Sequence, residues 1–551
     1  MGDTKIHKRR IGVDFKRMSA IEEIEQCINI KQNFLLSGGA GSGKTHTLLE
    51  TLQFIFNKDI NANVACITYT NVAANEIKLR SPYKSLYVST IHDFLWDIIK
   101  NYQKEIKTSI VELINRGNMQ KENGISYSGD IEITQEYMES IDKITYREYR
   151  KIEEGIISHN EVLKIANYMF KNYPLLCKIL SDKYEYIFID EYQDTQRNVI
   201  EIFLDYIEKE DTTIGLFGDK MQAIYDDGIG NIDEYVQNNK VKEIIKEDNY
   251  RCSQKVIELL NRVRKDIFQK PSNNNLIGSI KFLYSNLDLN AEEVKKENIF
   301  NEWDFSDVQN TKVLYLTNKL LASEQKFDIL YGEYSKYYNY DRALGDNKDA
   351  LIKHLYKIEE IIYLYKSGKY NEFMNKTNFK LYKLEDKKVL KENIDLVMNT
   401  KDKTIEEIID LVDLKGLVKK DDNLNEFIME NRDFYNIVKE IKYEQLSNMY
   451  NYEQGYTPYS TQHGVKGAEF DNVYIVLDNG KWTKYNFKYL FENSGNQNVI
   501  ERTRKIFYVC CSRAMNNLVI YFSKPGLKVV QEAQKIFGEE NVKEILRNKN
   551  G

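Results

Sequence analysis

The chain has 551 residues, of which 42% are hydrophobic and 29% are charged, and its formal net charge is −6 at pH 7. This composition is typical of a globular protein with room for three or four domains. No run of about 18 apolar residues occurs, so no membrane span is expected.

The cysteines and the charged residues limit the expected cellular compartment and the expected partners. The six cysteines are scattered without metal-ligand spacing, which favours a reducing cytoplasm over a disulfide framework. The basic residues Lys5, Lys8, Arg9 and Arg10 lead into no apolar stretch, so no secretory leader is expected. A mildly acidic chain can still carry a local basic groove, so nucleic-acid binding is not excluded.

Residues 38–45 read Gly-Gly-Ala-Gly-Ser-Gly-Lys-Thr, between an apolar run at 34–36 and a helical pattern at 46–56. This is the setting of a phosphate-binding loop. Glycines let backbone amides surround phosphate oxygens, and the helix N-terminus adds positive potential. Lys44 would reach the β- and γ-phosphates, and the Thr45 hydroxyl would ligate Mg²⁺. The expected nucleotide-binding residues are Gly38, Gly39, Ala40, Gly41, Ser42, Gly43, Lys44, Thr45 and His46.

Short apolar runs, rich in β-branched and aromatic residues, recur between helical patterns at 64–68, 186–189, 213–217, 313–316, 473–477 and 518–522. They predict parallel strands in α/β layers. They form one group before about residue 265 and another after about residue 278.

Two charged, amphipathic segments interrupt these groups, and the second has no proline and a helical pattern at 352–365. We therefore expect two α/β domains, each with a mostly helical insertion. The expected limits are 1–92 and 176–277 for the first domain, 93–175 for its insertion, 278–325 and 451–551 for the second domain, and 326–450 for its insertion.

Asp190 and Glu191 directly follow the run at 186–189. At the carboxyl end of such a strand, Asp190 would hold Mg²⁺ and Glu191 would orient and activate the attacking water. Taken alone, an Asp-Glu pair is equally well explained as a solvated acidic turn.

Further segments follow in a defined order: 67–76 (Ile-Thr-Tyr-Thr-Asn-Val-Ala-Ala-Asn-Glu), 190–195 (Asp-Glu-Tyr-Gln-Asp-Thr), 218–225 (Gly-Asp-Lys-Met-Gln-Ala-Ile-Tyr), 249–253 (Asn-Tyr-Arg-Cys-Ser), 461–470 (Thr-Gln-His-Gly-Val-Lys-Gly-Ala-Glu-Phe) and 508–514 (Tyr-Val-Cys-Cys-Ser-Arg-Ala). This ordered set resembles the helicase motifs of the UvrD/Rep/PcrA branch of superfamily 1. The resemblance covers roughly residues 33–265 and 280–525 apart from the insertions. It implies two RecA-like P-loop domains that hydrolyse ATP with Mg²⁺.

The resemblance also implies roles for single residues. Gln222 would sense the γ-phosphate, Tyr250 would stack on adenine, and Glu469 would bond the ribose. Arg251 and Arg513 would reach the γ-phosphate from the first and second domains. Outside this context a lone arginine or tyrosine is more often a surface or core residue. The expected catalytic residues are Lys44, Asp190, Glu191, Gln222, Arg251 and Arg513, with Thr45 and Asp190 as metal ligands.

By the same resemblance, a single-stranded DNA path would be lined by Tyr69, Thr70, Asn71, Thr90, His92 and His463. Aromatic stacking offers about 1–3 kcal/mol per base without sequence preference, which suits a translocating motor. The alternatives are sheet-edge packing for Tyr69 and an ordinary polar contact for His92.

The chain departs from the family pattern in several places. After Tyr225 the family continues with Arg-Trp-Arg, whose tryptophan stacks between bases, whereas this chain has Asp226-Asp227-Gly228. His46 replaces an arginine that commonly follows the phosphate loop, and Val72 replaces a lysine. No clear adenine-binding glutamine lies upstream of the loop. These differences predict weaker stacking on DNA bases and a less certain selectivity for adenine nucleotides.

The expected activity is that of an ATP-dependent single-stranded DNA translocase and helicase, implied to run 3′→5′. One alternative is a nucleotide-gated recognition subunit that hydrolyses ATP without unwinding DNA. Another is a P-loop kinase or GTPase, against which Arg251 and Arg513 argue.

The motif layout resembles the helicase component of the Gabija anti-phage system, and also small DNA-repair helicases. The sequence shows no nuclease constellation. The resemblance implies single-stranded or partially duplex DNA as a partner and, in the Gabija case, a nuclease subunit of the overcoming-lysogenization-defect (OLD) family.

Overall fold

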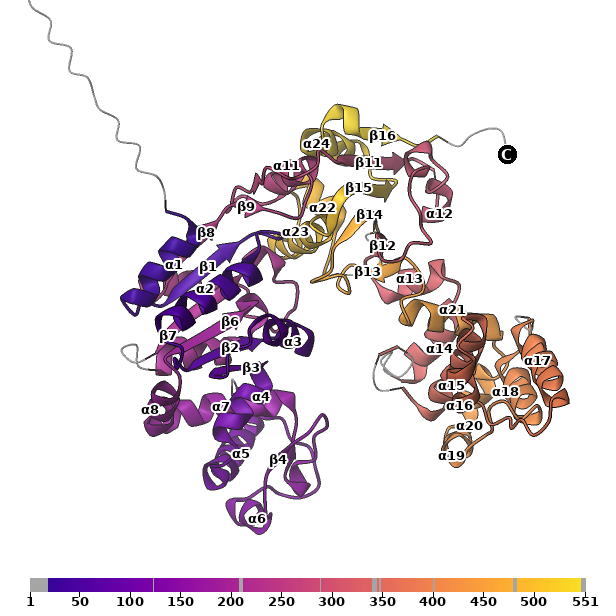
Figure 1. Ribbon diagram of the computed structural model, residues 1–551, viewed down its shortest axis with the longest axis horizontal. Coiled ribbons are helices and arrows are strands. Elements are labelled where there is room, and N and C mark those ends of the chain that lie inside the picture. Colours follow the sequence, from indigo (N-terminus) through magenta and orange to yellow (C-terminus); the bar gives the residue numbers. More distant parts are fainter. Residues whose placement is uncertain are drawn as a thin grey trace, which may run out of the picture. The chain divides into compact units, whose positions relative to one another are not determined.

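The computed structural model describes residues 18–121, 123–207, 212–287, 289–338, 344–345, 348–399, 402–478 and 483–546. The basic residues at 5–10 and the outer domain limits at 1 and 551 lie outside these ranges. The chain forms two compact units. The first extends to Cys252 and includes Leu260–Asn275, and the second comprises Ser253–Leu259 and the chain from Leu276 onward. Figure 1 colours the first unit from indigo into magenta and the second through orange to yellow.

The first unit contains a six-stranded parallel sheet in the order β3-β2-β6-β7-β1-β8 (Figure 1). Strands β1, β2 and β7 are buried along their whole length, as parallel strands covered by helices on both faces must be. The strands are β1 (Phe34–Gly38), β2 (Val64–Thr68), β3 (Leu86–Thr90), β6 (Tyr186–Asp190), β7 (Thr213–Gly218) and β8 (Lys242–Lys246).

The two faces of this sheet have separate cores because neighbouring side chains of a strand point in opposite directions. Phe34 and Leu36 pack with α1 (Ala20–Asn29), α2 (Lys44–Lys58) and α3 (Asn71–Arg80). Leu35 packs in the other core, which the helices of the first insertion share. These helices are α4 (Ile91–Ile99), α5 (Gln103–Asn118), α6 (Gln135–Ser140), α7 (His159–Asn172) and α8 (Pro174–Lys183), with the short strands β4 (Thr145–Tyr146) and β5 (Ile156–Ile157) and the 3₁₀ turn η1 (Ile152–Glu154) among them.

Short elements complete the first unit. They are η2 (Tyr192–Asp194), α9 (Arg197–Glu201), η3 (Ile202–Tyr206), η4 (Lys220–Gln222), α10 (Asp233–Gln237), β9 (Asp248–Asn249) and β10 (Lys270–Pro271). Helix α11 (Gln254–Val263) groups with the second unit as far as Leu259 and with the first unit afterwards.

The second unit has its own six-stranded parallel sheet, in the order β13-β12-β14-β15-β11-β16. If the strands of each sheet are numbered from 1 to 6 along the chain, the strand order across both sheets is 3-2-4-5-1-6. The two sheets therefore have the same topology. This confirms the expected α/β class with two RecA-like domains. The strands are β11 (Ser279–Ser285), β12 (Thr311–Tyr315), β13 (Tyr459–Thr461), β14 (Phe470–Leu477), β15 (Ala514–Ser523) and β16 (Val542–Glu544). The accompanying helices are α12 (Ala291–Val294), η5 (Asn298–Phe300), α22 (Phe487–Glu492), α23 (Gln497–Cys511), α24 (Leu527–Phe537) and η7 (Glu539–Asn541).

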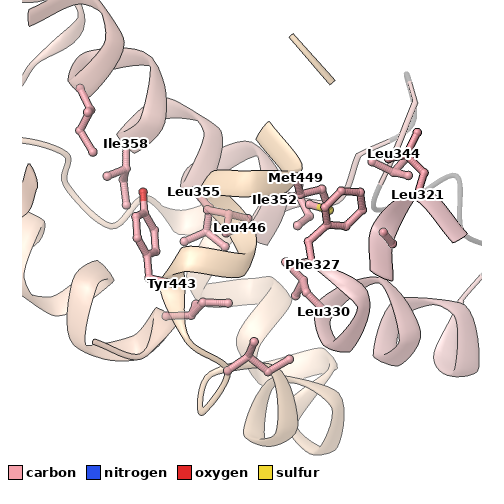
Figure 2. Close-up of a cluster of buried hydrophobic side chains, with 14 of the residues drawn as sticks. Leu321, Phe327, Leu330, Leu344, Ile352, Leu355, Ile358, Tyr443, Leu446 and Met449 are labelled. Carbon is pink, nitrogen blue, oxygen red and sulfur yellow. The ribbon is translucent and has the colours of Figure 1, made fainter. Parts of the chain in front are cut away.

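The helical insertion of the second unit runs between β12 and β13. Its longest helix, α15, begins at the Asp349 side chain, which accepts from the Ile352 N–H at 2.8 Å. Figure 2 shows Leu355 of this helix next to Leu446, and Ile352 next to Met449, in a buried apolar cluster. The helices are α13 (Asn318–Glu324), α14 (Asp328–Tyr337), α15 (Ala350–Lys366), α16 (Tyr370–Lys376), α17 (Glu385–Met398), α18 (Ile405–Leu414), α19 (Asp422–Glu430), α20 (Arg432–Val438) and α21 (Tyr443–Glu453).

The domain limits expected from the sequence stay predictions, because contacts divide the chain into two units only. Among the described residues, no helix combines the length and the apolar content needed to cross a membrane.

Candidate nucleotide and DNA sites

The predicted phosphate loop joins β1 to α2. Gly41 and Gly43 have φ angles of 77° and 74°, in the left-handed region that favours glycine. The buried Lys44 ammonium donates to the carbonyl oxygens of Gly38 at 3.1 Å and Gly39 at 3.4 Å. The Ser42 hydroxyl is buried and has no hydrogen-bond partner. A phosphate group would satisfy both this hydroxyl and the ammonium, so the loop fits a nucleotide.

Residues far along the chain hold this loop by hydrogen bonds to its backbone carbonyls. The Ala40 carbonyl accepts from the side-chain amides of Asn249 at 3.0 Å and Gln269 at 3.1 Å. The Tyr250 N–H donates to the Gly41 carbonyl at 2.8 Å. A Cβ atom on Gly39 would lie 2.2 Å from Gln269 Nε2, so only glycine fits there without displacing a buried side chain. The loop therefore has a fixed shape before any nucleotide binds.

Thr45 and Asp190 meet at the end of β6, where Thr45 Oγ1 donates to Asp190 Oδ2 at 3.4 Å. Burial and the neighbouring Glu191 carboxylate raise the pKa of Asp190 to about 7, while Lys44 opposes the shift. A buried carboxylate and a hydroxyl are oxygen ligands of the kind that Mg²⁺ prefers. Among the described residues, no cluster of three or more His, Cys, Asp or Glu could hold a metal ion. The pair therefore fits Mg²⁺ bound jointly by protein, nucleotide and water.

Glu191 has a φ angle of 52°, a costly conformation for a residue other than glycine that is concentrated at functional sites. Its carboxylate accepts from Gln193 Nε2 at 2.5 Å, and Gln193 Oε1 accepts from the Asp219 N–H at 3.1 Å. The Asp219 carboxylate in turn accepts from Gln222 Nε2 at 3.1 Å. The buried Gln193 therefore links two of the predicted catalytic residues. The sequence analysis quoted Gln193 within a motif but gave it no role.

A buried arginine anchors this network. Arg264 donates to both carboxylate oxygens of Asp219, at 3.2 and 3.3 Å, and the side chains of both residues are fully buried. It also donates to Asp266 at 2.9 and 3.1 Å. Burial alone would raise the pKa of Asp266, but the bonds and charge of Arg264 lower it. The sequence analysis missed Arg264 and Gln269, because they lie outside every motif.

The predicted adenine and γ-phosphate residues lie beside the loop. Tyr250 is 58% exposed, and a Cβ atom on Gly43 would lie 3.6 Å from its ring. A Cβ atom on Gly41 would lie 2.7 Å from the Cβ of Arg251. His46 is on α2, where its Nε2 lies 3.6 Å from a Glu50 carboxylate oxygen. The structure therefore gathers these residues at one end of the first sheet.

Arg513, His463 and Glu469 belong to the second unit. The buried Arg513 guanidinium donates to the carbonyls of Val509 at 3.0 Å and Ala468 at 3.1 Å. His463 Nε2 lies 2.8 Å from the Tyr485 hydroxyl. The contact with the Ala468 carbonyl places Arg513 next to the segment that carries Glu469. The roles of these three residues toward nucleotide and DNA stay predictions.

The structure brings five of the six predicted DNA-contact residues to one cavity of about 880 Å³. The hydroxyls of Thr70 and Thr90 also cap α3 and α4. The cavity is lined by Tyr69, Thr70, Asn71, Thr90 and His92, together with Asp93, Tyr146, Arg147, Glu148, Tyr149 and His159. The sequence analysis missed the lining residues from Asp93 onward, because the first insertion carries no recognisable motif.

Two tyrosine rings lie nearly parallel at this cavity and its border. The ring centroids of Tyr69 and Tyr225 are 6.4 Å apart with an angle of 16° between the rings, and both side chains are exposed. Partial burial of Tyr69 and the charges of Asp194 and Asp227 raise its pKa. Parallel exposed rings are suited to stacking on bases, whereas nearby carboxylates repel phosphates.

Comparisons with known proteins indicate which proteins this chain is similar to. A family model described as an AAA domain matches residues 22–227. Gabija protein GajB of Bacillus cereus (strain HuB5-5) is 27% identical over 95% of this chain and 98% of GajB. ATP-dependent DNA helicase Rep of Buchnera aphidicola subsp. Schizaphis graminum is 24% identical over 58% of this chain and 53% of Rep. ATP-dependent DNA helicase PcrA of Bacillus subtilis is 24% identical over 43% of this chain and 38% of PcrA. The similarities and the ordered motifs support a UvrD-like helicase of superfamily 1.

Proposed function

We propose that this protein is a DNA-stimulated ATPase that moves 3′→5′ along single-stranded DNA and separates duplex strands. One observation supports this proposal most directly. Glu191 is linked through Gln193 and Asp219 to Gln222. Only two residues separate Gln222 from Tyr225, which stacks on Tyr69 at the DNA cavity. A change at the hydrolysis site therefore has a short covalent and hydrogen-bonded route to the DNA contacts.

Each residue of the nucleotide site has a separate task. The loop amides and Lys44 bind the phosphates, and Glu191, held by Gln193, takes a proton from the attacking water. Thr45 and Asp190 would hold Mg²⁺, which when bound neutralises charge on the β- and γ-phosphates. Arg251 in the first unit and Arg513 in the second would stabilise the γ-phosphate during transfer. A planar guanidinium suits this task because it bonds two oxygens at once.

The DNA path in this proposal follows the cavity of the first unit. Tyr69 and Tyr225 would stack on bases, and Arg147 at the rim would contact the backbone. His463 would contact the strand from the second unit. The proposed domains are the two sheet domains with insertions at 93–175 and 326–450.

For the biological role, we propose anti-phage defence beside a nuclease subunit of the OLD family. The similarity to GajB supports this role because it extends over nearly the whole of both chains. A DNA-repair role is the alternative, because the motif layout also resembles small repair helicases; the similarities to the DNA helicases Rep and PcrA are shorter.

A second candidate function is a nucleotide-gated DNA switch that does not unwind. It is favoured by the acidic Asp226-Asp227-Gly228 segment, since the charges of Asp194 and Asp227 act on the stacking residue Tyr69. These carboxylates would weaken the grip on a phosphate backbone.

A strand-displacement assay on duplexes with a 3′ or a 5′ single-stranded tail tests the proposal. We expect ATP-dependent displacement of the 3′-tailed duplex, with Lys44→Ala as the inactive control. DNA-stimulated hydrolysis without displacement of either substrate would support the switch instead. Displacement from the 5′ tail alone would contradict the proposed direction.

A further inference from the structure

Lys246 ends β8 beside the phosphate-binding helix and is nine-tenths buried. Its ammonium donates to the Thr47 hydroxyl at 2.5 Å and lies 5.7 Å from the centroid of the Tyr250 ring. No carboxylate of the described residues forms an ion pair with it. Lys246 is thus a cation at the nucleotide site that no motif contains and that has no ion-pair partner in the part of the chain that the structure describes.

A buried ammonium group without an ion-pair partner destabilises the folded protein when no ligand is bound. A buried charge costs several kcal/mol unless it is paired. Burial lowers the pKa of Lys246; the more distant Glu50 and Asp248 oppose the shift, and the charge of Lys44 adds to it. The two ammonium groups therefore repel each other across the phosphate loop, and an anion bound there would relieve both the repulsion and the missing pairing.

The position of Lys246 identifies which part of an anion it would meet. Thr47 lies in the first turn of α2, three residues after Lys44. In a phosphate loop the lysine reaches the β- and γ-phosphates, whereas the backbone amides surround the α- and β-phosphates. The family arginine at position 46 is absent, and the His46 side chain is 71% exposed. Lys246, held by the Thr47 hydroxyl, is therefore a second buried cation beside this helix, in addition to Lys44.

We propose that Lys246 binds the α-phosphate of the nucleotide and so replaces the missing arginine charge. This inference rests on the proposed ATPase function. A contact with the α-phosphate is present in ATP, in ADP and in the transition state alike. It should therefore contribute uniform binding, which changes KM but not kcat.

The test is direct binding of fluorescent N-methylanthraniloyl ATP and ADP to the full chain, combined with steady-state hydrolysis. Lys246→Met keeps the length of the side chain and removes its charge. We expect it to weaken ATP and ADP binding by the same factor, about 10- to 100-fold. KM for ATP should rise by that factor, with kcat on saturating single-stranded DNA almost unchanged. Lys246→Arg should restore most of the affinity.

Two further variants make the result specific. Lys242→Met, at the other end of β8, removes a half-exposed lysine that pairs with Glu23 and should bind nucleotides like the parent. Thr47→Val keeps every charge but removes the hydroxyl that holds Lys246. It should give the same pattern with smaller amplitude, which preserves the test if Lys246→Met fails to fold.

The outcomes separate the inference from the proposed function. Parent-like affinity of Lys246→Met for both nucleotides would overturn the inference and leave the ATPase proposal intact. A loss of ATP affinity without a loss of ADP affinity would place Lys246 at the γ-phosphate and also overturn it. Failure of the unsubstituted protein to bind either nucleotide would instead contradict the proposed function.

Discussion

The Gln193 side chain hydrogen-bonds to Glu191, with Nε2 of the amide 2.5 Å from a carboxylate oxygen. Because the other end of the same amide accepts from the Asp219 N–H, Gln193 fixes the proposed water activator against the segment that carries Gln222. Asp219 is itself held by the buried Arg264. The proposed catalytic groups are therefore positioned by buried residues outside the proposed set of nucleotide contacts.

Substitution of Glu191 should separate ATP binding from hydrolysis. Glu191→Gln removes the proton acceptor, so turnover should fall by about 10²- to 10⁴-fold. ATP should remain bound, because the phosphate loop and the Thr45–Asp190 pair are unchanged. Phosphate release and nucleotide retention on a filter measure the two properties. Lys44→Ala is the control and should lose both, whereas hydrolysis at the parent rate by Glu191→Gln would show that another group activates the water.

Loss of Arg264 should destabilise the first unit. Arg264→Met leaves the fully buried Asp219 carboxylate without its cation and also removes the partner of the more exposed Asp266, which should lower the free energy of unfolding by about 3–5 kcal/mol. Arg264→Lys should not restore it, because one ammonium cannot bond two carboxylates in the manner of a planar guanidinium.

Denaturant unfolding of the two Arg264 variants measures this effect. The nearby exposed Lys265 provides a control. Lys265→Met should change the free energy of unfolding by less than about 0.5 kcal/mol. Equal losses of unfolding free energy at both positions would mean that the buried ion pair does not stabilise the first unit.

The sequence predicted most of the central strands, but it missed β11, which lies between β15 and β16. The run at 64–68 coincides with β2, and the pattern at 46–56 lies within α2. The edge strands were missed for a physical reason. Strand β8 reads Lys-Glu-Ile-Ile-Lys, because one side of an edge strand faces solvent and tolerates charge.

The candidate site was predictable only where it follows a motif. The phosphate loop and Asp190 are continuous with their strands, so the local sequence identifies them. Gln269 and Lys246 lie 229 and 199 positions from their partners Ala40 and Thr47. Contacts between such distant segments appear only when the sheet is assembled, and no local pattern encodes them.

Stacking by Tyr69 and Tyr225 should account for much of the single-stranded DNA affinity. Replacing either tyrosine with alanine should cost about 1–3 kcal/mol of binding free energy. Fluorescence anisotropy with a labelled oligonucleotide measures the change. Tyr382→Ala removes a tyrosine that is 89% exposed in the second unit and should bind like the parent. Unaltered affinity in both cavity variants would exclude this pair as a base-stacking site.

His92 should make stability depend on pH in a defined direction. Burial and the neighbouring His159 lower its pKa to about 4, although Asp93 opposes the shift. The unfolded chain binds a proton near pH 6.5, so the stabilisation is complete above that pH and is lost as the pH falls toward 4.

Between pH 7.5 and 5.5 the parent should therefore lose on the order of 1 kcal/mol more stability than His92→Gln. Unfolding curves of both proteins at the two pH values provide the comparison. Parallel losses in parent and variant would show that His92 titrates normally in the folded chain.

The rate of ATP hydrolysis with and without single-stranded DNA tests the central claim most directly. The hydrogen bonds from Glu191 through Gln193 and Asp219 reach Gln222, which is three residues before Tyr225. DNA should therefore raise the rate of ATP hydrolysis about tenfold or more, which corresponds to an activation barrier lower by about 1.4 kcal/mol or more. The Tyr69→Ala/Tyr225→Ala double variant should lose this stimulation while retaining its DNA-free rate. Hydrolysis that is equally fast with and without DNA would contradict a DNA motor and favour a P-loop enzyme of another kind.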